Sequence, residues 1–383
     1  MLLSNSFTKA SFTKAIGIAL SRLAVRYGMR NSSNRGSELF FLTIKFVTVF
    51  IILSASQIVL GDDHACLESL STSINEKAQQ SEIYEISSRH LSDRFRSINF
   101  DQPNVEVNKW LGNHWSRTTV DDALPIGGSG MLTIIYVHGN FMDRNNALER
   151  VRIVNGYLKA QADRPFRLLM LSWPSQREKK PLRDVLSNAE SAESQSLFVA
   201  WMLQRLRNES QVSLLGFSFG ARAVTGGLHL DAGGVIPGFA TSPMPTQDSS
   251  MKYRLGLVAP ALDRNWLEQN GRHQLAMSHV ESLVNLYNSK DPILRRFRFI
   301  DRLTSPIAAG FAGFTGLNSL ADPRATAPLA GQSRIRQYDC GSGIGTTHSE
   351  KSYYGECPYF RTVIEHLLWK VPGESNCNAS VVP

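Results

Sequence analysis

The pentapeptide Gly216-Phe217-Ser218-Phe219-Gly220 stands near the middle of a chain of 383 residues and decides the expected fold. The apolar run Val212–Leu215 precedes it, and a segment able to form a helix follows it. A sharp turn from strand to helix holds a serine Oγ clear of the backbone, where a histidine can reach it. Small residues two before and two after the serine let neighbouring chains approach closely. We therefore predict a nucleophile elbow with Ser218 at its tip.

Short unbroken apolar runs recur around this pentapeptide. They are Ile134–Val137, Leu168–Leu171, Val212–Leu215, Leu255–Val258 and Leu283–Tyr287. Runs of this length suit strands that are buried on both faces of a parallel sheet. Apolar residues at helical spacing lie between them, in Asn145–Ala160 and in a longer helix that ends at Leu206. The alternation predicts an α/β protein with a doubly wound, mostly parallel sheet and helices on both faces.

Composition divides the chain into four expected parts. In chain order they are a leader (1–61), an extension with edge strands (62–130), the α/β core (131–371) and a tail (372–383). In the extension, Glu82–Ile86 and Asn104–Val107 alternate polar with apolar residues, as half-buried edge strands do, and Gly127–Gly130 predicts a flexible turn. Pro306–Ala330 has no clear period and is either a lid or a poorly patterned helix pair.

Positive charge is concentrated in the leader. Residues 1–60 contain seven Lys or Arg and one Glu, so most of the formal charge of +8 belongs there and nucleic-acid binding loses its main support. The apolar run Phe46–Leu53 predicts a signal peptide for export or an uncleaved membrane anchor. A repeated Ser-Phe-Thr-Lys-Ala ahead of it indicates a transit peptide or a true start at Met29, and we prefer the second because it gives a signal peptide of normal length.

Four cysteines, Cys66, Cys340, Cys357 and Cys377, all lie beyond the leader. This suits two disulfides in an oxidising compartment, with three possible pairings; four reduced cysteines inside the cell are the alternative. A Cys340–Cys357 bridge would clamp a loop containing His348, with a chain-entropy contribution of about 3 kcal/mol. No segment of the sequence is a convincing match to a metal-ligand spacing, a phosphate loop or a dinucleotide fingerprint, so we expect no cofactor.

His138-Gly139-Asn140-Phe141 follows the first of the buried runs. In a hydrolytic α/β sheet, a loop at this point supplies one amide of the oxyanion hole, and the residue after the nucleophile supplies the other. We therefore assign the donors to Phe219 and to Asn140 or Phe141, with Asn140 preferred. His138 is expected to brace the loop and not to act as a base.

These segments resemble the α/β-hydrolase superfamily, in particular bacterial members with a His-Gly-Asn or His-Gly-Tyr oxyanion loop. The resemblance covers roughly residues 82–370 and rests on Val137–Asn140, Leu171–Pro174 and Leu214–Gly220, together with the acid and histidine segments described next. It implies the α/β-hydrolase fold and a serine hydrolase of the esterase or lipase type. It does not identify the substrate.

The superfamily places serine, acid and histidine in that order along the chain. After the elbow, Asp291 follows the run Leu283–Tyr287, where an acid that orients the histidine is expected. The alternative is an ordinary aspartate in a turn before proline. Asp263, one predicted strand earlier, is the rival acid.

Two histidines, His348 and His366, follow Asp291. His366 lies in Tyr359–Lys370, where apolar residues recur at helical spacing, so we expect it on a packing helix. His348 lies in a loop beyond the strand-like Arg334–Tyr338, a position that suits a general base.

The expected chemistry follows from these residues. Ser218 attacks an acyl carbon, His348 transfers the proton, and Asp291 orients the imidazole. The expected protein is a carboxylic-ester hydrolase that acts on a small-molecule or lipid-like acyl substrate through an acyl-enzyme. An acyltransferase or amidase with the same triad, and an inactive binding protein that keeps the fold, are the alternatives.

Other side chains leave two interpretations each. Trp173 either lines the pocket or packs in the core. Arg222 either ties down the elbow helix by a salt bridge or binds an anionic substrate. The basic cluster is either a solvated face or a surface for anionic lipid or polysaccharide; it consists of Lys290, Arg295, Arg296 and Arg298.

Overall fold

The structure is a computed structural model, which describes residues 80–91, 95–175, 181–239, 251–299, 306–317 and 334–370, without the side chains of 181–184 and 299. The expected leader, Cys66, Cys377, the tail and residues 318–330 lie outside these ranges. Within them, no helix has both the length and the hydrophobicity that a membrane crossing requires.

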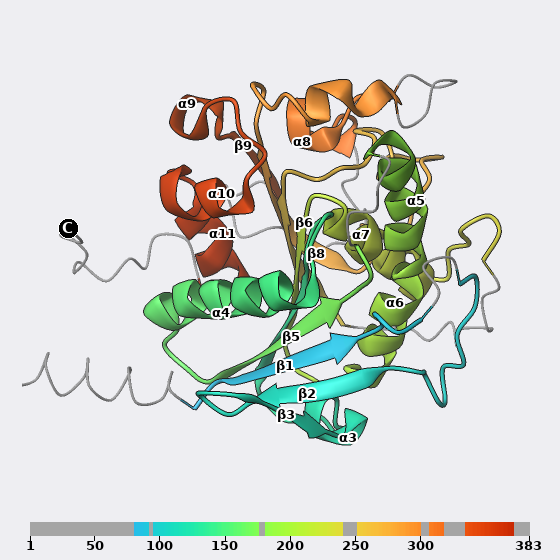
Figure 1. The fold of residues 1–383 in the computed structure, drawn as a ribbon, viewed down its shortest axis with the longest axis vertical. Coiled ribbons are helices and arrows are strands. Elements are labelled where there is room, and N and C mark those ends of the chain that lie inside the picture. The colour runs from blue at the N-terminus through green and yellow to red at the C-terminus, as the bar shows by residue number, and fades with distance from the viewer. Residues whose placement is uncertain are drawn as a thin grey trace, which may run out of the picture. The chain divides into compact units, whose positions relative to one another are not determined.

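A nine-stranded, mostly parallel sheet organises the described residues (Figure 1). Its order is β3-β2-β1-β5-β4-β6-β7-β8-β9, and β2 alone runs against its two neighbours. The strands are β1 (Glu82–Ser87), β2 (Glu106–Trp110), β3 (Trp115–Thr118), β4 (Leu132–Val137), β5 (Phe166–Ser172), β6 (Val212–Phe217), β7 (Tyr253–Val258), β8 (Val280–Tyr287) and β9 (Ile335–Asp339). All five apolar runs lie in strands of this sheet.

Helices cover both faces of the sheet. Figure 1 shows α4, α10 and α11 on one side and α5, α6 and α7 on the other. The helical segments are α3 (Val120–Ala123), α4 (Arg144–Gln161), α5 (Pro181–Ser194), α6 (Ser196–Arg205), α7 (Gly220–Asp231), the 3-10 helix η1 (Leu294–Phe299), α8 (Ala309–Ala312), α9 (Gly341–Ile344), α10 (Glu350–Glu356) and α11 (Phe360–Leu367). The predicted α/β class, with a mostly parallel sheet between two helical layers, is confirmed.

Local sequence explains where the longer helices begin and break. Asp143 starts α4 because its side chain accepts a hydrogen bond from the Asn146 amide at 2.8 Å. The long helix expected to end at Leu206 is instead the pair α5 and α6, separated by Gln195 alone. The buried side chain of Gln195 accepts a hydrogen bond from Ser88 Oγ at 2.7 Å, which ties the break to the residue after β1.

The expected edge positions of Glu82–Ile86 and Asn104–Val107 are wrong. β1 lies between β2 and β5, β2 lies between β3 and β1, and the edge falls to β3. Cations neutralise the glutamates of β1: buried Glu85 accepts from Arg144 Nε at 3.1 Å, and half-buried Glu82 accepts from Lys109 at 2.6 Å. Alternation of polar and apolar residues in this strand therefore marks paired charges and not a solvent-facing side.

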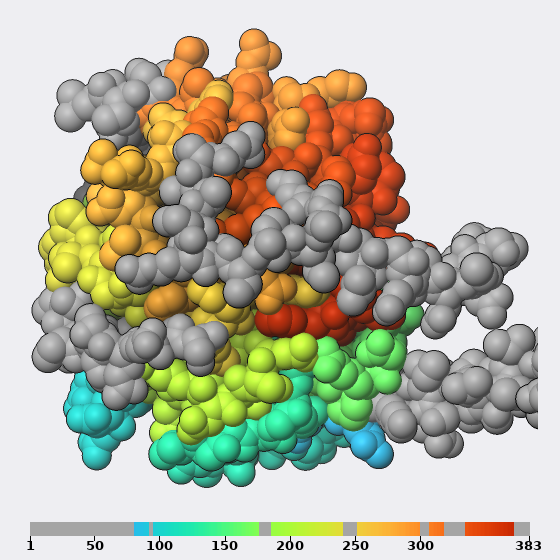
Figure 2. All heavy atoms as spheres, turned by 180° about the vertical axis from the view of Figure 1, so that it is seen from behind, coloured from blue at the N-terminus to red at the C-terminus, as the bar shows by residue number. Residues whose placement is uncertain are grey.

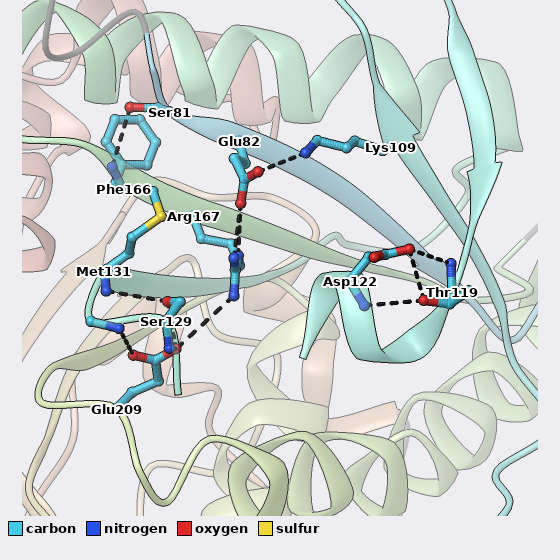
Figure 3. A network of polar contacts seen from close by, with 11 residues as sticks. Ser81, Glu82, Lys109, Thr119, Asp122, Ser129, Met131, Phe166, Arg167 and Glu209 are labelled. Carbon is cyan, nitrogen blue, oxygen red and sulfur yellow. Dashed lines mark hydrogen bonds and ion pairs between the residues drawn. The ribbon is translucent and has the colours of Figure 1, made fainter. Parts of the chain in front are cut away.

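The Gly127–Gly130 turn is closed around a carboxylate rather than left as an open linker. Glu209, only 4% exposed, accepts hydrogen bonds from the Ser129 amide at 2.7 Å, the Ser129 hydroxyl at 2.6 Å and the Gly130 amide at 3.1 Å (Figure 3). Arg167 on β5 lies 4.0 Å from the same carboxylate. These contacts fix the chain as it enters β4.

The order of the strands determines where a site can form. From β4 the chain passes through α4 to β5 on one side, and then through α5 and α6 to β6 on the other side of β4. Such a reversal leaves a crevice at the carboxyl ends of the two central strands. Here these strands are β4 and β6, whose ends meet at the pair Val137 and Gly216.

Seen from behind, the surface of the described residues runs in the same order as the strands of the sheet. Figure 2 shows the residues of β2 and β3 (cyan) at one end and residues near η1 and α8 (orange) at the other. The segments that hold Ser218, Asp291 and His348 belong to the central strands and to the half of the sheet that contains β8 and β9.

Candidate active site

Ser218 occupies the turn between β6 and α7 in a left-handed conformation, with φ of 51°. Two neighbouring backbone segments hold this turn. The Ser218 amide donates to Val258 at 3.0 Å, and its carbonyl accepts from Ala261 at 3.0 Å. A non-glycine residue with positive φ is strained, so it persists only where its surroundings fix it. The hydrogen bonds to the end of β7 provide that constraint.

The two glycines of the pentapeptide permit close contact between backbones. A Cβ on Gly220 would lie 2.1 Å from the carbonyl oxygen of Val137, and a Cβ on Gly216 would lie 2.7 Å from the Cα of Ala221. Neither separation is possible for real atoms. Gly220 thus lets α7 start directly against the end of β4, and Gly216 lets α7 start directly against the end of β6.

The structure brings the three sequence-predicted residues of the triad together. Ser218 Oγ lies 2.9 Å from His348 Nε2, and His348 Nδ1 lies 2.6 Å from Asp291 Oδ2. A carboxylate can only accept a hydrogen bond, so the neutral imidazole carries its proton on Nδ1. Nε2 is then free to accept the proton of the serine hydroxyl.

Asp291 divides its two oxygens between the backbone and the histidine. Oδ1 accepts from the amides of Ile293 at 2.8 Å and Leu294 at 3.0 Å, at the start of η1. Oδ2 faces His348, and the side chain is fully buried. The rival Asp263 accepts from its neighbour Asn265 at 3.1 Å and is not joined to His348.

A disulfide closes the segment that carries His348. Cys340 and Cys357, both buried, are bridged with their Cα atoms 5.3 Å apart, which places the end of β9 against the end of α10. On the sheet side, the Phe217 ring lies 5.5 Å from the imidazole. Of the possible disulfide pairings, the structure thus contains the Cys340–Cys357 bridge.

Glu350, two residues after His348, is a buried carboxylate that sequence reasoning missed. Oε1 accepts from Tyr136 on β4 at 2.7 Å and from the Tyr354 hydroxyl, and Oε2 lies 3.1 Å from Arg150 on α4. Burial raises the pKa of Glu350, and Arg150 opposes this shift most strongly. Contacts from β4 and α4 thus anchor the start of α10.

His138 is neutral and braces the loop after β4. Its Nε2 accepts from the Trp173 amide at 3.2 Å and lies 3.1 Å from Arg89, so its Nδ1 donates to the Gly139 carbonyl at 2.8 Å. Burial, with Arg89 second, lowers the pKa of His138 to about 3. Trp173 is fully buried and stacks on His138, which makes it a packing residue.

The loop that carries the expected oxyanion residues Asn140 and Phe141 begins against Ser218, because a Cβ on Gly139 would lie 3.2 Å from Ser218 Cβ. Asn188 on α5 donates to Asn140 Oδ1 at 2.7 Å and steadies this loop. The Phe219 amide, just before α7, donates to no acceptor in the described part of the chain.

Arg222 braces the elbow, and no ion pair joins it to another of the described residues. It is buried, donates to the carbonyls of Ala261 at 2.9 Å and Ala189 at 3.2 Å, and lies 4.7 Å from the Trp266 ring. Burial lowers the pKa of Arg222 to about 10, and the nearby Glu193 opposes this shift. The guanidinium therefore faces protein groups, which argues against contact with an anionic substrate.

The remaining predicted features form no hydrogen bond with Ser218 in the described part of the chain. His366 is buried on α11, as expected, with Nε2 3.2 Å from the Ser282 carbonyl. Of Pro306–Ala330, the described residues 306–317 include the short helix α8, whose Gly310 carbonyl accepts from the Asn288 amide at 2.9 Å. Lys290, Arg295, Arg296 and Arg298 are exposed. Among the described residues, no group of three or more His, Cys, Asp or Glu side chains could hold a metal ion.

Comparison with known proteins adds little to this geometry. No protein-family model matches the sequence, and no curated protein does. Among solved structures, the chain is similar to an inhibited esterase B from Lactobacillus rhamnosis, at 13% identity, 81% coverage of this chain, 93% coverage of that chain and a TM-score of 0.29. This likeness is too weak to assign a family or an activity.

Proposed function

We propose that the protein is a serine hydrolase of the α/β-hydrolase fold that cleaves carboxylic esters. One observation carries the proposal, the continuous chain of contacts from Ser218 through His348 to Asp291, at 2.9 Å and 2.6 Å. These distances are within reach for proton transfer between a nucleophile, its base and the acid that orients the base.

The proposed reaction needs only the triad, the two backbone amides and water. As Ser218 Oγ attacks the acyl carbon, His348 Nε2 takes the hydroxyl proton, and the negative charge on the former carbonyl oxygen faces the amides of Phe219 and Asn140. The tetrahedral intermediate expels the alkoxide, which leaves as an alcohol with the proton from His348. Water then repeats the sequence on the acyl-enzyme and releases the acid.

The surroundings support an apolar acyl group. Phe141, next to Asn140, is 38% exposed, and Ile293, two residues after Asp291, is 57% exposed. These exposed apolar side chains neighbour the proposed oxyanion loop and acid in the sequence, and they favour the acyl chain of a small-molecule or lipid-like ester over a highly charged substrate.

The test uses the purified full-length protein, a fluorophosphonate probe and a panel of p-nitrophenyl esters. The wild type should take up one probe and hydrolyse esters, and Ser218→Ala should lose labelling and reduce kcat by about a millionfold. Ser213→Ala is the matched control, because Ser213 lies buried on β6, the strand that leads to Ser218, and donates to the Leu367 carbonyl at 2.8 Å. Ester hydrolysis that survives in Ser218→Ala would refute the assignment.

Product analysis separates hydrolysis from acyl transfer. With an added alcohol, an ester hydrolase should still release mainly free acid, whereas an acyltransferase would release a new ester. An amide panel run in parallel would reveal an amidase, and a probe-reactive protein without turnover on any panel would contradict the ester-hydrolase proposal.

A further inference from the structure

A buried asparagine directly after β8 reaches the loop that carries the histidine. Nδ2 of Asn288 donates to the carbonyls of Gly345 at 2.9 Å and Thr347 at 3.0 Å. Its Oδ1 accepts from the Lys290 amide at 2.8 Å, and the side chain is fully buried. Both N–H groups of the amide are therefore used, and the position of Oδ1 fixes the orientation of the amide plane.

This loop has few other anchors. Within the part of the chain that the structure describes, hydrogen bonds to residues 345–348 from outside the disulfide-closed segment 340–357 come from Asn288, Asp291 and Ser218 alone. Asp291 and Ser218 are themselves members of the proposed triad. Among the described residues, Asn288 is thus the one side chain outside the proposed triad and the disulfide-closed segment that hydrogen-bonds to residues 345–348.

Asn288 also belongs to the turn that carries the acid. The Asp291 amide donates to the Asn288 carbonyl at 3.0 Å, so the two residues belong to one hydrogen-bonded turn. The Asn288 side chain in this turn binds the backbone before His348, and the Asp291 carboxylate in the same turn binds the imidazole. We infer that Asn288 is a positioning residue, which sets the imidazole between Asp291 and Ser218; the inference rests on the proposed function.

The residue type is specific to this task. Two carbonyl oxygens must be satisfied at once, and an asparagine amide supplies two donors from one short side chain. An ionised aspartate at 288 supplies none and would press its charge against the same two carbonyls. Displacement of a catalytic group by about 1 Å can cost roughly 100-fold in rate.

The test compares two aspartate variants in the full-length protein. Asn288→Asp should lower kcat on the best ester by roughly 100-fold or more with KM nearly unchanged, because binding of the ester does not need the imidazole in place. Asn285→Asp is the matched control. Asn285 lies on β8, is also fully buried, and donates to Gln337 at 3.0 Å away from the histidine loop. It should lose comparable stability in urea and keep kcat.

A second readout does not depend on turnover. The proton between His348 Nδ1 and Asp291 Oδ2, in a 2.6 Å hydrogen bond, should give a far-downfield ¹H NMR resonance that His348→Ala abolishes. We expect Asn288→Asp to lose or broaden this resonance and Asn285→Asp to keep it. If Asn288→Asp does not fold, Asn288→Ser replaces it, since its shorter side chain cannot reach both carbonyls.

The outcomes separate the two claims. A variant at 288 that folds, retains kcat and retains the downfield proton overturns the positioning role. Loss of the resonance at 288 alone, in a protein that shows no Ser218-dependent hydrolysis, would support the positioning role and reject the proposed function. Equal losses of resonance in both variants would reduce Asn288 to a general stability residue and overturn the inference.

Discussion

The two carboxylate oxygens of Asp291 have different hydrogen-bond partners, which explains why Asp291 and not Asp263 faces His348. Two backbone amides hold Oδ1 at 2.8 Å and 3.0 Å, which fixes the plane of the carboxylate. Oδ2 is then aimed at His348 Nδ1. Asp263 has the same place at the end of a neighbouring strand, but its bond to Asn265 keeps it within its own turn.

Asp291→Asn should therefore lower kcat by about 10,000-fold, because an amide N–H facing Nδ1 stabilises the wrong tautomer of His348. Asp263→Asn, the matched change at the rival position, should leave kcat within about twofold, in the range typical of surface changes. Steady-state kinetics on one ester would decide between them. A large loss from Asp263→Asn would point to the wrong acid.

At this scale, sequence reasoning predicted from chain order three residues that the structure places within hydrogen-bond distance of one another. Ser218, Asp291 and His348 each stand directly after a strand or in a loop, and the order of their types limits the choices. Asn288 and Glu350 gave no such signal. Their partners lie 57 and 214 residues away, and only the folded sheet brings them together.

At the scale of elements, the start of α7 against β4 depends on one missing methyl group. A Cβ at Gly220 would overlap the Val137 carbonyl and would lie 2.7 Å from the His138 carbonyl oxygen, and neither backbone group can rotate away. The strands on either side were readable from apolar runs, because burial on both faces needs continuous apolar sequence. β1 was placed wrongly at an edge, because its glutamates are neutralised by Arg144 and Lys109 and mimic a solvated face.

Gly220→Ala should destabilise the protein by about 3 kcal/mol, since overpacking against backbone cannot be relieved by a side-chain rotation. Gly156→Ala is the control. Gly156 is exposed in α4 with nothing within 4 Å of a new Cβ, so alanine should add about 0.5–1 kcal/mol of stability. Urea denaturation of both variants measures the difference. A Gly220→Ala protein as stable as wild type would contradict the packing.

For the whole molecule, buried histidines couple stability to pH. Burial lowers the pKa of His366 to about 3, with Arg254 and Arg336 contributing next, and lowers the pKa of His273 to about 4 despite Glu193 beside it. An unfolded chain binds a proton at these sites near pH 6.5. Between about pH 6.5 and the folded pKa values, the unfolded state holds more protons, so the free energy of unfolding falls as pH falls.

His366→Gln removes one of these groups while keeping a donor for the Ser282 carbonyl. The free energy of unfolding should then fall less steeply between about pH 6.5 and pH 4.5, by up to about 1.4 kcal/mol per pH unit. Urea titrations of wild type and variant across this range measure both slopes. Parallel slopes would show that His366 is not the neutral buried group described above.

The disulfide between Cys340 and Cys357 has a consequence for a cleaved chain. The bond closes a ring through the backbone, and His348 lies inside that ring. A protease that cut any single peptide bond between the two cysteines would leave both ends covalently joined. The nicked protein would still carry its histidine segment, and two fragments would separate on a denaturing gel only after reduction.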